Sequence, residues 1–455
     1  MQHQYIAPSP VPGMAKPEGD TQASSQWSWV EASIWTKRML TALDNGVQGG
    51  RWYSLMDKVA APRTVEVAWK RVAANKGAAG VDGISLTRFK ARASHYLREL
   101  EKALREGRYQ PLPARRVHIP KGPGKTRPLG ISAVKDRIVQ TAIRMVVEPI
   151  FEREFLPSNY GFRPGRGCQE ALREVEQGLK RGATWVVDAD LESYFDSIPK
   201  IPLLARVTEK MSDGTLLDLI QRFLDQDILD GMHQWTPLAG VPQGSGLSPL
   251  LSNLYLHPFD QVMAQAGYTS VRSCDDFVIL CRTQAEAEAA LAAVDAWMTQ
   301  HGLRLHPEKT RIVEASTDDR GFDFLGYRFA KGRRYVRPKS LQALRDKIRQ
   351  KTGRTRSGSL TQILADLSPM LRGWFGYFKH ARASTFQAID GFVRRRLRAI
   401  LRRRHKRQSA GRTLQDHQRW PNAFFAAQGL FTLHEAYTYC ISRRHVFGGK
   451  QLRVL

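Results

Sequence analysis

The stretch Trp185-Val-Val-Asp-Ala-Asp-Leu-Glu192 decides the fold of this 455-residue chain. It begins with apolar residues, as a buried strand does, and it ends in carboxylates. Tyr194, Phe195 and Asp196 follow directly. A strand that ends in this way presents Asp190 at the edge of a sheet, next to aromatic residues.

A second acidic site is the pair Asp275-Asp276, which lies between Val271 and the apolar run 277–280. Because β-forming residues flank the pair, we expect a tight hairpin with carboxylates at its tip. Asp190 beside such a tip would complete an all-oxygen site of the kind that suits Mg²⁺. Two such ions, about 4 Å apart, activate a 3′-hydroxyl and stabilise the leaving pyrophosphate in nucleotidyl transfer.

Each acidic site also has a plainer interpretation. Taken alone, an Asp-Asp pair in a turn is usually solvated, and Asp190 alone could cap a helix or pair with a cation. Two further motifs favour chemistry. PQGSGLSP at 242–249 combines glycines that allow close backbone approach with an amide that can meet a base or sugar, and the basic segment 116–127 offers cations for triphosphate oxygens. In isolation, each of these is more often an ordinary turn or a solvated loop.

Composition limits the class of protein. Apolar residues make up 42% of the chain and charged residues 25%, which is ordinary for a globular protein with a buried core. The four cysteines form no CxxC pair, so we expect no disulfide scaffold and no structural zinc site, and a reducing cytosol fits. No apolar run approaches the roughly 20 residues that span a bilayer, so we expect no membrane association.

Charge is distributed unevenly along the chain. The net charge is +27, and residues 331–455 hold 29 Lys/Arg against five Asp/Glu. A nearly neutral body with a strongly basic end region indicates a polyanionic partner, of which nucleic acid is the leading candidate.

The pattern of elements indicates five parts. Residues 1–50 form a leader that is partly disordered, and residues 51–114 are helical. Strands alternate with helices in 115–337, including a capped helix over 284–301 that begins at Thr283 with Glu286 three residues later. Helices are expected at about 339–351, 359–380 and 386–408, within a part that spans 338–410. Residues 411–455 form a small appended module.

Nine stretches of the chain follow one another in a specific order: NKGAAGVDG at 75–83, IPKGPGKTRPLGI at 119–131, NYGFRPGR at 159–166, DADLESYFD at 188–196, PQG at 242–244, CDDF at 274–277, GLRLHPEKT at 302–310, FDFLGY at 322–327 and LRGWFGYF at 371–378. In this order they resemble the reverse transcriptase–maturase encoded by bacterial group II introns, from about Trp52 onward. The resemblance implies an α+β right-hand polymerase, with fingers and a palm that contain an antiparallel sheet and the carboxylate hairpin. A helical thumb or maturase domain and a C-terminal DNA-binding module at 411–455 would follow.

The resemblance also implies roles for particular residues. Asp190, Asp275 and Asp276 would hold two Mg²⁺ ions, with the Leu191 carbonyl as a further ligand, and Lys309 would act near the leaving pyrophosphate. Phe195 matches the aromatic gate against a ribose 2′-hydroxyl, so dNTPs are the expected substrates. The residues that match dNTP, template or primer contacts of the family are Lys121, Arg127, Leu191, Phe195, Gln243, Gly244, Phe324, Leu325 and Gly326.

The basic helical region has its own expected partner. Ten Lys/Arg and no acid lie between positions 391 and 412, a cationic face able to follow an RNA backbone. A solvated helix is the plainer interpretation of a short charge run. With the resemblance, group II intron RNA is the expected ligand, and the expected contacts are Arg394, Arg395, Arg396, Arg398, Arg402, Arg403, Arg404, Lys406 and Arg407.

The chain departs from the family in two places. The family usually has Tyr two residues before the paired aspartates, and this chain has Ser273, so we expect altered or reduced polymerisation. Many relatives also carry a C-terminal His-Asn-His endonuclease with paired cysteines, which is missing before Leu455. By resemblance, we expect priming without cleavage of the second target strand.

The leading function is therefore an RNA-directed DNA polymerase that binds its intron RNA, assists splicing and copies the RNA into DNA during retrohoming. Its expected partners are intron RNA, an RNA template, a DNA primer or target and dNTPs, in a cytosolic ribonucleoprotein of unknown oligomeric state. One alternative is an RNA-binding splicing cofactor with weak or no polymerase activity, which Ser273 favours. Another is a host-adopted or defence-associated reverse transcriptase, which the gene neighbourhood would reveal.

Overall fold

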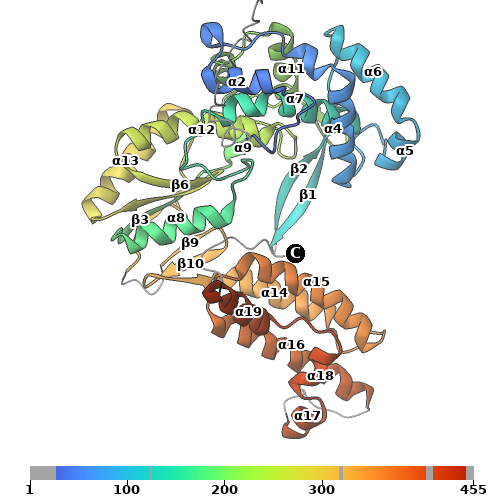
Figure 1. The fold of residues 1–455 in the computed structure, drawn as a ribbon, viewed down its shortest axis with the longest axis vertical. Helices are drawn as coiled ribbons and strands as arrows, with labels where there is room; N and C mark the ends of the chain where they lie inside the picture. The colour runs from blue at the N-terminus through green and yellow to red at the C-terminus, as the bar shows by residue number, and fades with distance from the viewer. Residues whose placement is uncertain (1–26, 123, 317–320, 406–412, 447–455) are drawn as a thin grey trace, which may run out of the picture. The chain divides into compact units, whose positions relative to one another are not determined.

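The computed structural model describes residues 27–122, 124–316, 321–405 and 413–446, apart from a few side chains, among them those of Lys121 and Lys125 (Figure 1). The predicted disorder of the leader and the predicted contacts of Lys406 and Arg407 lie outside these residues. The chain combines helical regions with antiparallel sheets, which confirms the α+β class. It divides into two compact units, which are described separately.

The first unit contains Met1–Phe155, Phe162–Gly165 and Phe195–His257. Helix α7 (Val134–Glu152) is buried along most of its length, and other helices pack against it. Among the described residues, the other helices that lie wholly in this unit are α2 (Lys37–Asn45), η1 (Gln48–Gly50), α3 (Met56–Val59), α4 (Pro62–Ala74), α5 (Leu86–Ala91), α6 (Ala93–Arg105), α10 (Lys200–Thr208) and α11 (Gly214–Leu224).

A four-stranded sheet completes this unit. Its order is β2-β1-β4-β5, where β1 (Ala114–Gly122) and β2 (Lys125–Ile131) form a long antiparallel hairpin. This hairpin contains the basic segment 116–127. The short strands β4 (Ile228–Asp230) and β5 (His233–Trp235) extend the sheet, with β4 parallel to β1.

The second unit contains Leu156–Gly161, Arg166–Tyr194 and Pro258–Leu455. Helices α9 (Tyr194–Ser197) and α12 (Ser248–Gln265) contain residues of both units. The central sheet of the second unit is antiparallel, in the order β6-β7-β3-β8: β6 (Thr269–Ser273), β7 (Asp276–Cys281), β3 (Trp185–Asp190) and β8 (Arg311–Glu314).

The two faces of this sheet carry different residues, because side chains alternate along a strand. On β7, Phe277 faces Phe259, which in turn contacts Trp297 of α13 (Gln284–Gln300). Val278 and Leu280 point the other way, into a core that includes α8 (Cys168–Lys180). The register pairs Val186 with Leu280, Asp188 with Val278 and Asp190 with Asp276. Apolar residues and acids therefore share one face, with the acids at its end.

This core continues into the C-terminal helices of the same unit. It includes residues of the three-stranded sheet β11-β10-β9, made of β9 (Phe322–Phe324), β10 (Tyr327–Ala330) and β11 (Arg333–Val336). It also includes residues of five helices: α14 (Pro338–Lys351), α15 (Leu360–Phe378), α16 (Ala383–Arg404), α18 (Asn422–Ala427) and α19 (Leu433–Val446). Helix α17 (Leu414–Arg419) is followed by Trp420, which is also part of the core. The sheet and the helices are one hydrophobic body.

Most predicted helices are present within a few residues. The helix expected over 284–301 is α13, and the Thr283 side chain accepts a hydrogen bond from the backbone N–H of Glu286. The three helices expected after residue 337 are α14, α15 and α16, of which α16 begins at Ala383 and ends at Arg404. The division into five functional parts stays a prediction.

Candidate polymerase active site

Strand register brings three carboxylates together in the second unit. Asp190 lies directly opposite Asp276 on the neighbouring strand, and Asp188 lies two residues earlier on the same face. Asp275 occupies the two-residue turn between β6 and β7, where Ser273 and Asp276 close the hairpin. The sequence predicted both the strand-end acid and the hairpin, and the structure places these acids on adjoining strands.

Burial and mutual repulsion raise the pKa of two of these acids. The pKa of Asp276 is raised to about 7, first by burial and then by the charges of Asp188, Asp190 and Asp275. The pKa of Asp188 is raised to about 6 by burial, despite the ion pair that it makes with Arg311. Such crowding of carboxylates costs free energy, and a bound cation would lower that cost.

Lys309 supplies one positive charge beside these acids. Its ammonium group forms an ion pair with Asp190. The loop that carries Lys309 is fixed by the backbone, because the N–H of His306 donates to the carbonyl of Asp190 over 2.8 Å. Leu191 is buried and forms an isolated antiparallel bridge with Leu305. The predicted catalytic residues Asp190 and Lys309 are thus in direct contact.

Oxygen donors dominate this site, as Mg²⁺ requires. Among the described residues, no group of three or more His, Cys, Asp or Glu side chains could hold a metal ion as the side chains stand. Asp190 is engaged by Lys309 instead. The residues fit a divalent cation in charge and in donor chemistry. Such a cation would relieve the repulsion that, after burial, raises the pKa of Asp276.

A buried ion pair supports the carboxylate hairpin. The side chains of Arg272 and Asp260 are both fully buried, and the Nε of Arg272 donates to the carboxylate of Asp260 over 2.7 Å. A second nitrogen of Arg272 donates to the carbonyl of Cys274, at 3.0 Å, in the turn that carries Asp275. Cys274 has a φ of +66°, which is uncommon for a residue other than glycine. The arginine therefore stabilises a strained turn beside the acids that the sequence predicts to be catalytic.

Residues 159–161 pack against the same turn. A Cβ built on Gly161 would lie 2.4 Å from the backbone nitrogen of Cys274, so only glycine fits there. The backbone N–H of Tyr160 donates to the carbonyl of Arg272 over 2.8 Å. These contacts give a structural reason for part of the NYGFRPGR stretch.

The predicted primer-grip residues form a separate hairpin in this unit. Phe324 ends β9, and Leu325 and Gly326 form the turn to β10. Phe324 is buried in the common core. The backbone N–H of Leu325 lies close enough to the carboxylate of Asp276 to offset a small part of the rise in its pKa. The hairpin predicted from FDFLGY thus meets one of the predicted metal ligands.

The first unit brings together a second group of predicted residues. The Nε of Arg127 donates to the amide oxygen of Gln243 over 3.1 Å, and the amide nitrogen of Gln243 donates to Asp196 over 2.8 Å. Asp196 directly follows Phe195, whose carbonyl accepts from the N–H of Val241 at 2.7 Å. Gln243 therefore connects the basic hairpin to the residue beside the predicted sugar gate.

The backbone around Gln243 is equally constrained. The carbonyl of Gln243 accepts a hydrogen bond from the N–H of Gly130 over 2.7 Å. Gly244 has a φ of +105°, and a Cβ there would lie 2.4 Å from the carbonyl oxygen of Gly130. The glycine of the PQG motif is needed for this close approach to β2.

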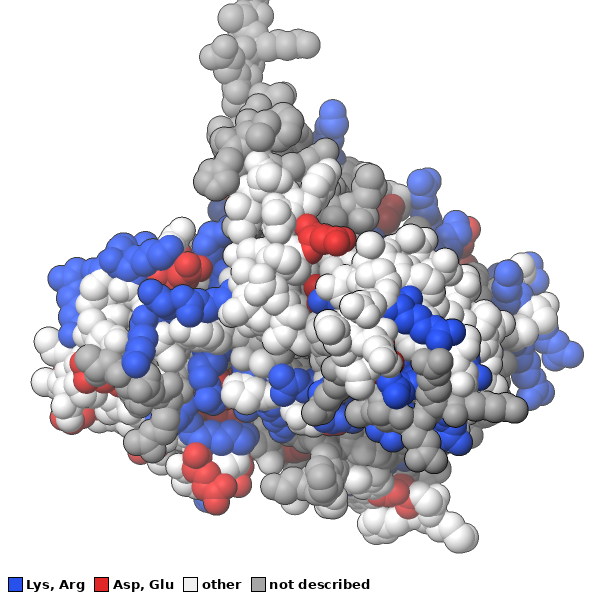
Figure 2. Space-filling view, turned by 90° about the horizontal axis from the view of Figure 1, so that it is seen from below, with Lys and Arg blue, Asp and Glu red and all other residues white. Residues whose placement is uncertain are grey.

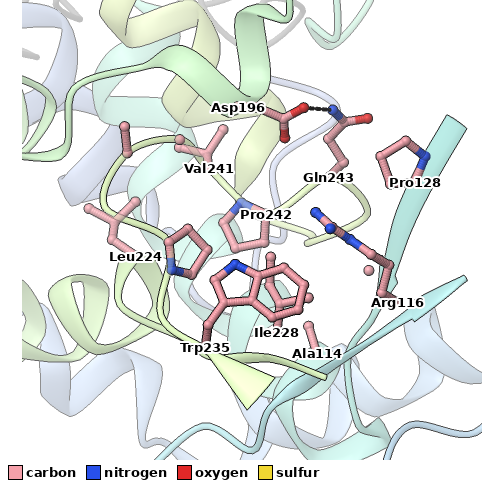
Figure 3. A pocket seen from close by; sticks show the side chains of 14 residues that line it. Ala114, Arg116, Pro128, Asp196, Leu224, Ile228, Trp235, Val241, Pro242 and Gln243 are labelled. Carbon is pink, nitrogen blue, oxygen red and sulfur yellow. Dashed lines mark hydrogen bonds between the residues drawn. The ribbon is translucent and has the colours of Figure 1, made fainter. Parts of the chain in front are cut away.

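A cavity of about 130 Å³ lies beside these groups in the same unit (Figure 3). Figure 3 shows the hydrogen-bonded pair of Asp196 and Gln243 at one side and the guanidinium of Arg116 near the indole of Trp235. The distance from the Arg116 guanidinium carbon to the indole centroid is 4.8 Å. The wall of the cavity combines proline and aromatic surface with a cation. The side chain of Lys121, predicted to hold triphosphate, lies outside the described residues.

The basic residues of α16 have different environments. Arg398 is buried and donates to the carbonyl of Trp420 over 2.9 Å, and Arg402 pairs with Asp416 at 2.7 Å. Arg396 donates to the carbonyl of Thr352 over 2.7 Å. These three guanidinium groups hold helices of the unit together, a role that the charge run alone did not predict. The other predicted contacts on this helix are half-buried Arg394 and Arg395 and exposed Arg403 and Arg404.

The Lys and Arg side chains on the surface are grouped in clusters (Figure 2). On the face shown in Figure 2, Lys and Arg side chains lie in clusters, and Asp and Glu side chains are fewer and scattered. A guanidinium cluster of the helical region joins α14 to α16, where Arg349 and Arg395 both lie against the ring of Phe392. Repulsion from Arg349 and Arg395, after burial, lowers the pKa of Arg396. A polyanion would relieve this repulsion.

No helix in the described part of the chain is long and apolar enough to cross a membrane.

Two family models match the chain. The one described as "Reverse transcriptase (RNA-dependent DNA polymerase)" matches residues 119–329, and the one described as "Group II intron, maturase-specific domain" matches residues 341–420. The first match includes both groups of predicted polymerase residues. The second includes α15, α16 and the basic run.

Similar proteins agree with these matches. Protein YkfC of Escherichia coli (strain K12) is 35% identical over 353 residues, which cover 68% of this chain and 91% of YkfC. The group II intron-encoded protein LtrA of Lactococcus lactis subsp. cremoris is 35% identical over 205 residues, which cover 45% of this chain and 34% of LtrA. This chain thus matches most of YkfC and about a third of LtrA.

A chain of a solved structure, titled "Partial Cas6-RT-Cas1--Cas2 complex", overlaps this structure with a TM-score of 0.36 and 28% identity, over 54% of this chain and 41% of that one. At this TM-score the overlap supports no conclusion about function. The two family models and the curated relatives, in contrast, identify the family. The chain belongs to the bacterial group II intron reverse transcriptase–maturase family, whose members are RNA-directed DNA polymerases that act in intron splicing and mobility.

Proposed function

We propose that the chain polymerises DNA with two Mg²⁺ ions held by Asp190, Asp275 and Asp276, with the Leu191 carbonyl as a further ligand. The family generally uses divalent metal ions. When bound, such ions lower the pKa of an attacking hydroxyl and stabilise the charge that develops on the leaving pyrophosphate.

The observation that carries this proposal is the acidic sheet face. Asp190 and Asp276 are register partners, and repulsion adds to burial in raising the pKa of Asp276 to about 7. A fold that had no use for these charges would gain stability by replacing them with apolar residues.

The proposed roles of the other predicted residues rest on the family resemblance and on the contacts that some of them make. Lys309, paired with Asp190, is a cation placed to meet the leaving phosphates. Arg127 and Lys121 hold the incoming triphosphate, and Gln243 orients Arg127 through its amide oxygen. Phe195 excludes a ribose 2′-hydroxyl, so dNTPs are the substrates, and hairpin residues Phe324, Leu325 and Gly326 hold the primer strand.

The helical region is proposed to bind group II intron RNA. The maturase match at 341–420 implies RNA binding, and the exposed cations Arg403 and Arg404 lie within it. Electrostatic binding of this kind weakens steeply as salt concentration rises. We place the resulting ribonucleoprotein in the bacterial cytosol, with an RNA template and a DNA primer or target as further partners.

The experiment that tests the proposal is primer extension on an RNA template with Mg²⁺ and dNTPs. It compares the wild-type protein with the double variant Asp275→Ala/Asp276→Ala. Asp295→Ala is the matched control, because Asp295 is an exposed acid on α13. We expect extension by the wild type and the control and none by the double variant. Extension by the double variant would contradict the proposal.

A further inference from the structure

The turn of the proposed primer-grip hairpin has an unusual backbone. Leu325 and Gly326 have φ values of +46° and +79°, the pattern of a two-residue turn with both central residues left-handed. Glycine or asparagine normally occupies the first of these positions, and leucine rarely does. Contacts from outside the turn must therefore hold Leu325 in place.

Both backbone groups of Leu325 have such contacts. On one side, the backbone N–H of Leu325 lies close enough to the carboxylate of Asp276 to lower the pKa of that acid, against the larger effect of burial. On the other, its carbonyl accepts a hydrogen bond from the hydroxyl of Tyr377, at 2.7 Å. One residue thus connects a predicted metal ligand of the sheet with helix α15.

Tyr377 is itself held firmly. Its own carbonyl accepts a hydrogen bond from the hydroxyl of Tyr327 at 2.7 Å and another from the amide of Gln169 at 2.8 Å. Burial, first of all, raises the pKa of the Tyr377 hydroxyl, so this group remains a proton donor at any pH at which a polymerase works. These contacts fix the end of α15 against both helix α8 and the hairpin.

We propose that Tyr377 is a positioning residue of the polymerase site: its hydroxyl holds the Leu325 carbonyl and so aims the Leu325 backbone at Asp276. The proposal rests on the roles proposed above for Asp276 and the hairpin. It assigns to α15, a helix of the maturase-specific match, a direct part in the geometry of polymerisation.

The test is Tyr377→Phe, which removes one oxygen atom and leaves the ring in place. We expect kcat for primer extension to fall about five- to tenfold, the effect of one lost hydrogen bond, with the KM for dNTP unchanged. Hydrogen exchange of the segment 322–330 should become faster, because the turn is no longer held. This second measurement does not depend on activity.

Two matched variants separate the positioning of Leu325 by the Tyr377 hydroxyl from the attachment of α15 to the hairpin. Tyr335→Phe removes a hydroxyl on the neighbouring strand β11 and should behave as wild type. Tyr327→Phe weakens the attachment of α15 to the hairpin without touching Leu325, so its kcat should fall less than that of Tyr377→Phe. Equal losses of kcat in Tyr327→Phe and Tyr377→Phe would overturn the proposal. So would a kcat of Tyr377→Phe that equals that of Tyr335→Phe.

A further arm, Asp276→Ala, keeps the two proposals distinct. If Asp276→Ala abolishes extension while Tyr377→Phe extends normally, the positioning role fails and the proposed function stands. If Asp276→Ala retains full extension, the proposed role of Asp276 fails, and the positioning role that depends on it fails too.

Discussion

The carboxylate face of the second unit and the Arg127–Gln243–Asp196 group of the first unit are built in different ways. Asp188, Asp190 and Asp276 lie on paired strands, so backbone register sets their positions. The first-unit group lies largely at the surface. Its members come from strand β2, the short helix α9 and a loop, and side-chain hydrogen bonds of 3.1 and 2.8 Å join them.

The geometry of the first site is therefore fixed by the backbone, and that of the second by side-chain hydrogen bonds. A rigid, half-buried arrangement suits acids that must stay close together although they repel one another. An exposed arrangement of side chains can adjust when a triphosphate arrives. We therefore expect substitutions around the carboxylate face to have large effects and substitutions in the first-unit group to have small ones.

The largest effect is expected at the ion pair under the carboxylate hairpin. Arg272→Met leaves the Asp260 carboxylate buried without its cation, which should lower the free energy of unfolding by about 3–5 kcal/mol. Urea denaturation measures this change. The control is Arg328→Met, since Arg328 pairs with Asp323 at a partly exposed site and should cost less than about 1 kcal/mol. Similar losses in both variants would show that burial of the pair does not matter.

A large effect on catalysis is expected at Asp276. Asp276→Ala should reduce single-turnover extension more than about 100-fold, as loss of a metal ligand does. Its free energy of unfolding at pH 8 should not fall, because the variant loses a carboxylate whose pKa is raised to about 7 by burial and repulsion. A variant that is less stable and still active would reverse this interpretation.

A smaller effect is expected at Asp196. Asp196→Ala removes the acceptor of the Gln243 amide and should raise the KM for dNTP about two- to tenfold, with little change in kcat. Asp196→Asn keeps an acceptor oxygen and should restore most of the affinity. Steady-state kinetics of the two variants provide the comparison, and equal KM values in both would rule out the hydrogen bond as the cause.

The smallest effect on polymerisation is expected at Asp136, a buried acid of the first unit that lies outside the predicted site. Burial raises its pKa from 3.8 to about 7, although the hydroxyl of Tyr109 donates to it over 2.6 Å. The folded protein therefore keeps this proton between about pH 4 and pH 7, where the unfolded chain has lost it.

It follows that the contribution of Asp136 to the free energy of unfolding falls as the pH rises through this range and levels off above pH 7. In Asp136→Asn this part of the pH dependence should disappear, while the kcat of extension at a fixed pH changes little. Denaturation curves at several pH values measure it. A variant with the same pH profile as wild type would show that Asp136 does not titrate in this range.

The sequence was sufficient to predict the carboxylate hairpin and the long helices. Asp190 ends an apolar run, and Asp275-Asp276 separates two β-forming runs, so local pattern and alternation determined their place. Helix α13 was predictable because Thr283 and a regular apolar period mark its start and its buried face.

What the sequence did not show depends on contacts between distant residues. Arg272 lies in a buried strand, which signals a hidden partner, but nothing local identifies Asp260 as that partner. Likewise, the run of arginines in α16 looked uniform, because exposure is decided by what packs against each position. Arg398 is buried and donates a hydrogen bond to the carbonyl of Trp420, whereas Arg403 is exposed.

The continuous core of the second unit has a consequence for how the protein is made. Its members extend from Ala171 on α8 to Leu433 on α19. The strands therefore emerge from the ribosome before the helices that pack against them have been synthesised. Until then, the apolar face of the central sheet of the second unit is uncovered, so it can aggregate or bind chaperones. For such a chain, we expect soluble yield to depend on the speed of translation and on chaperone supply as much as on the stability of the finished fold.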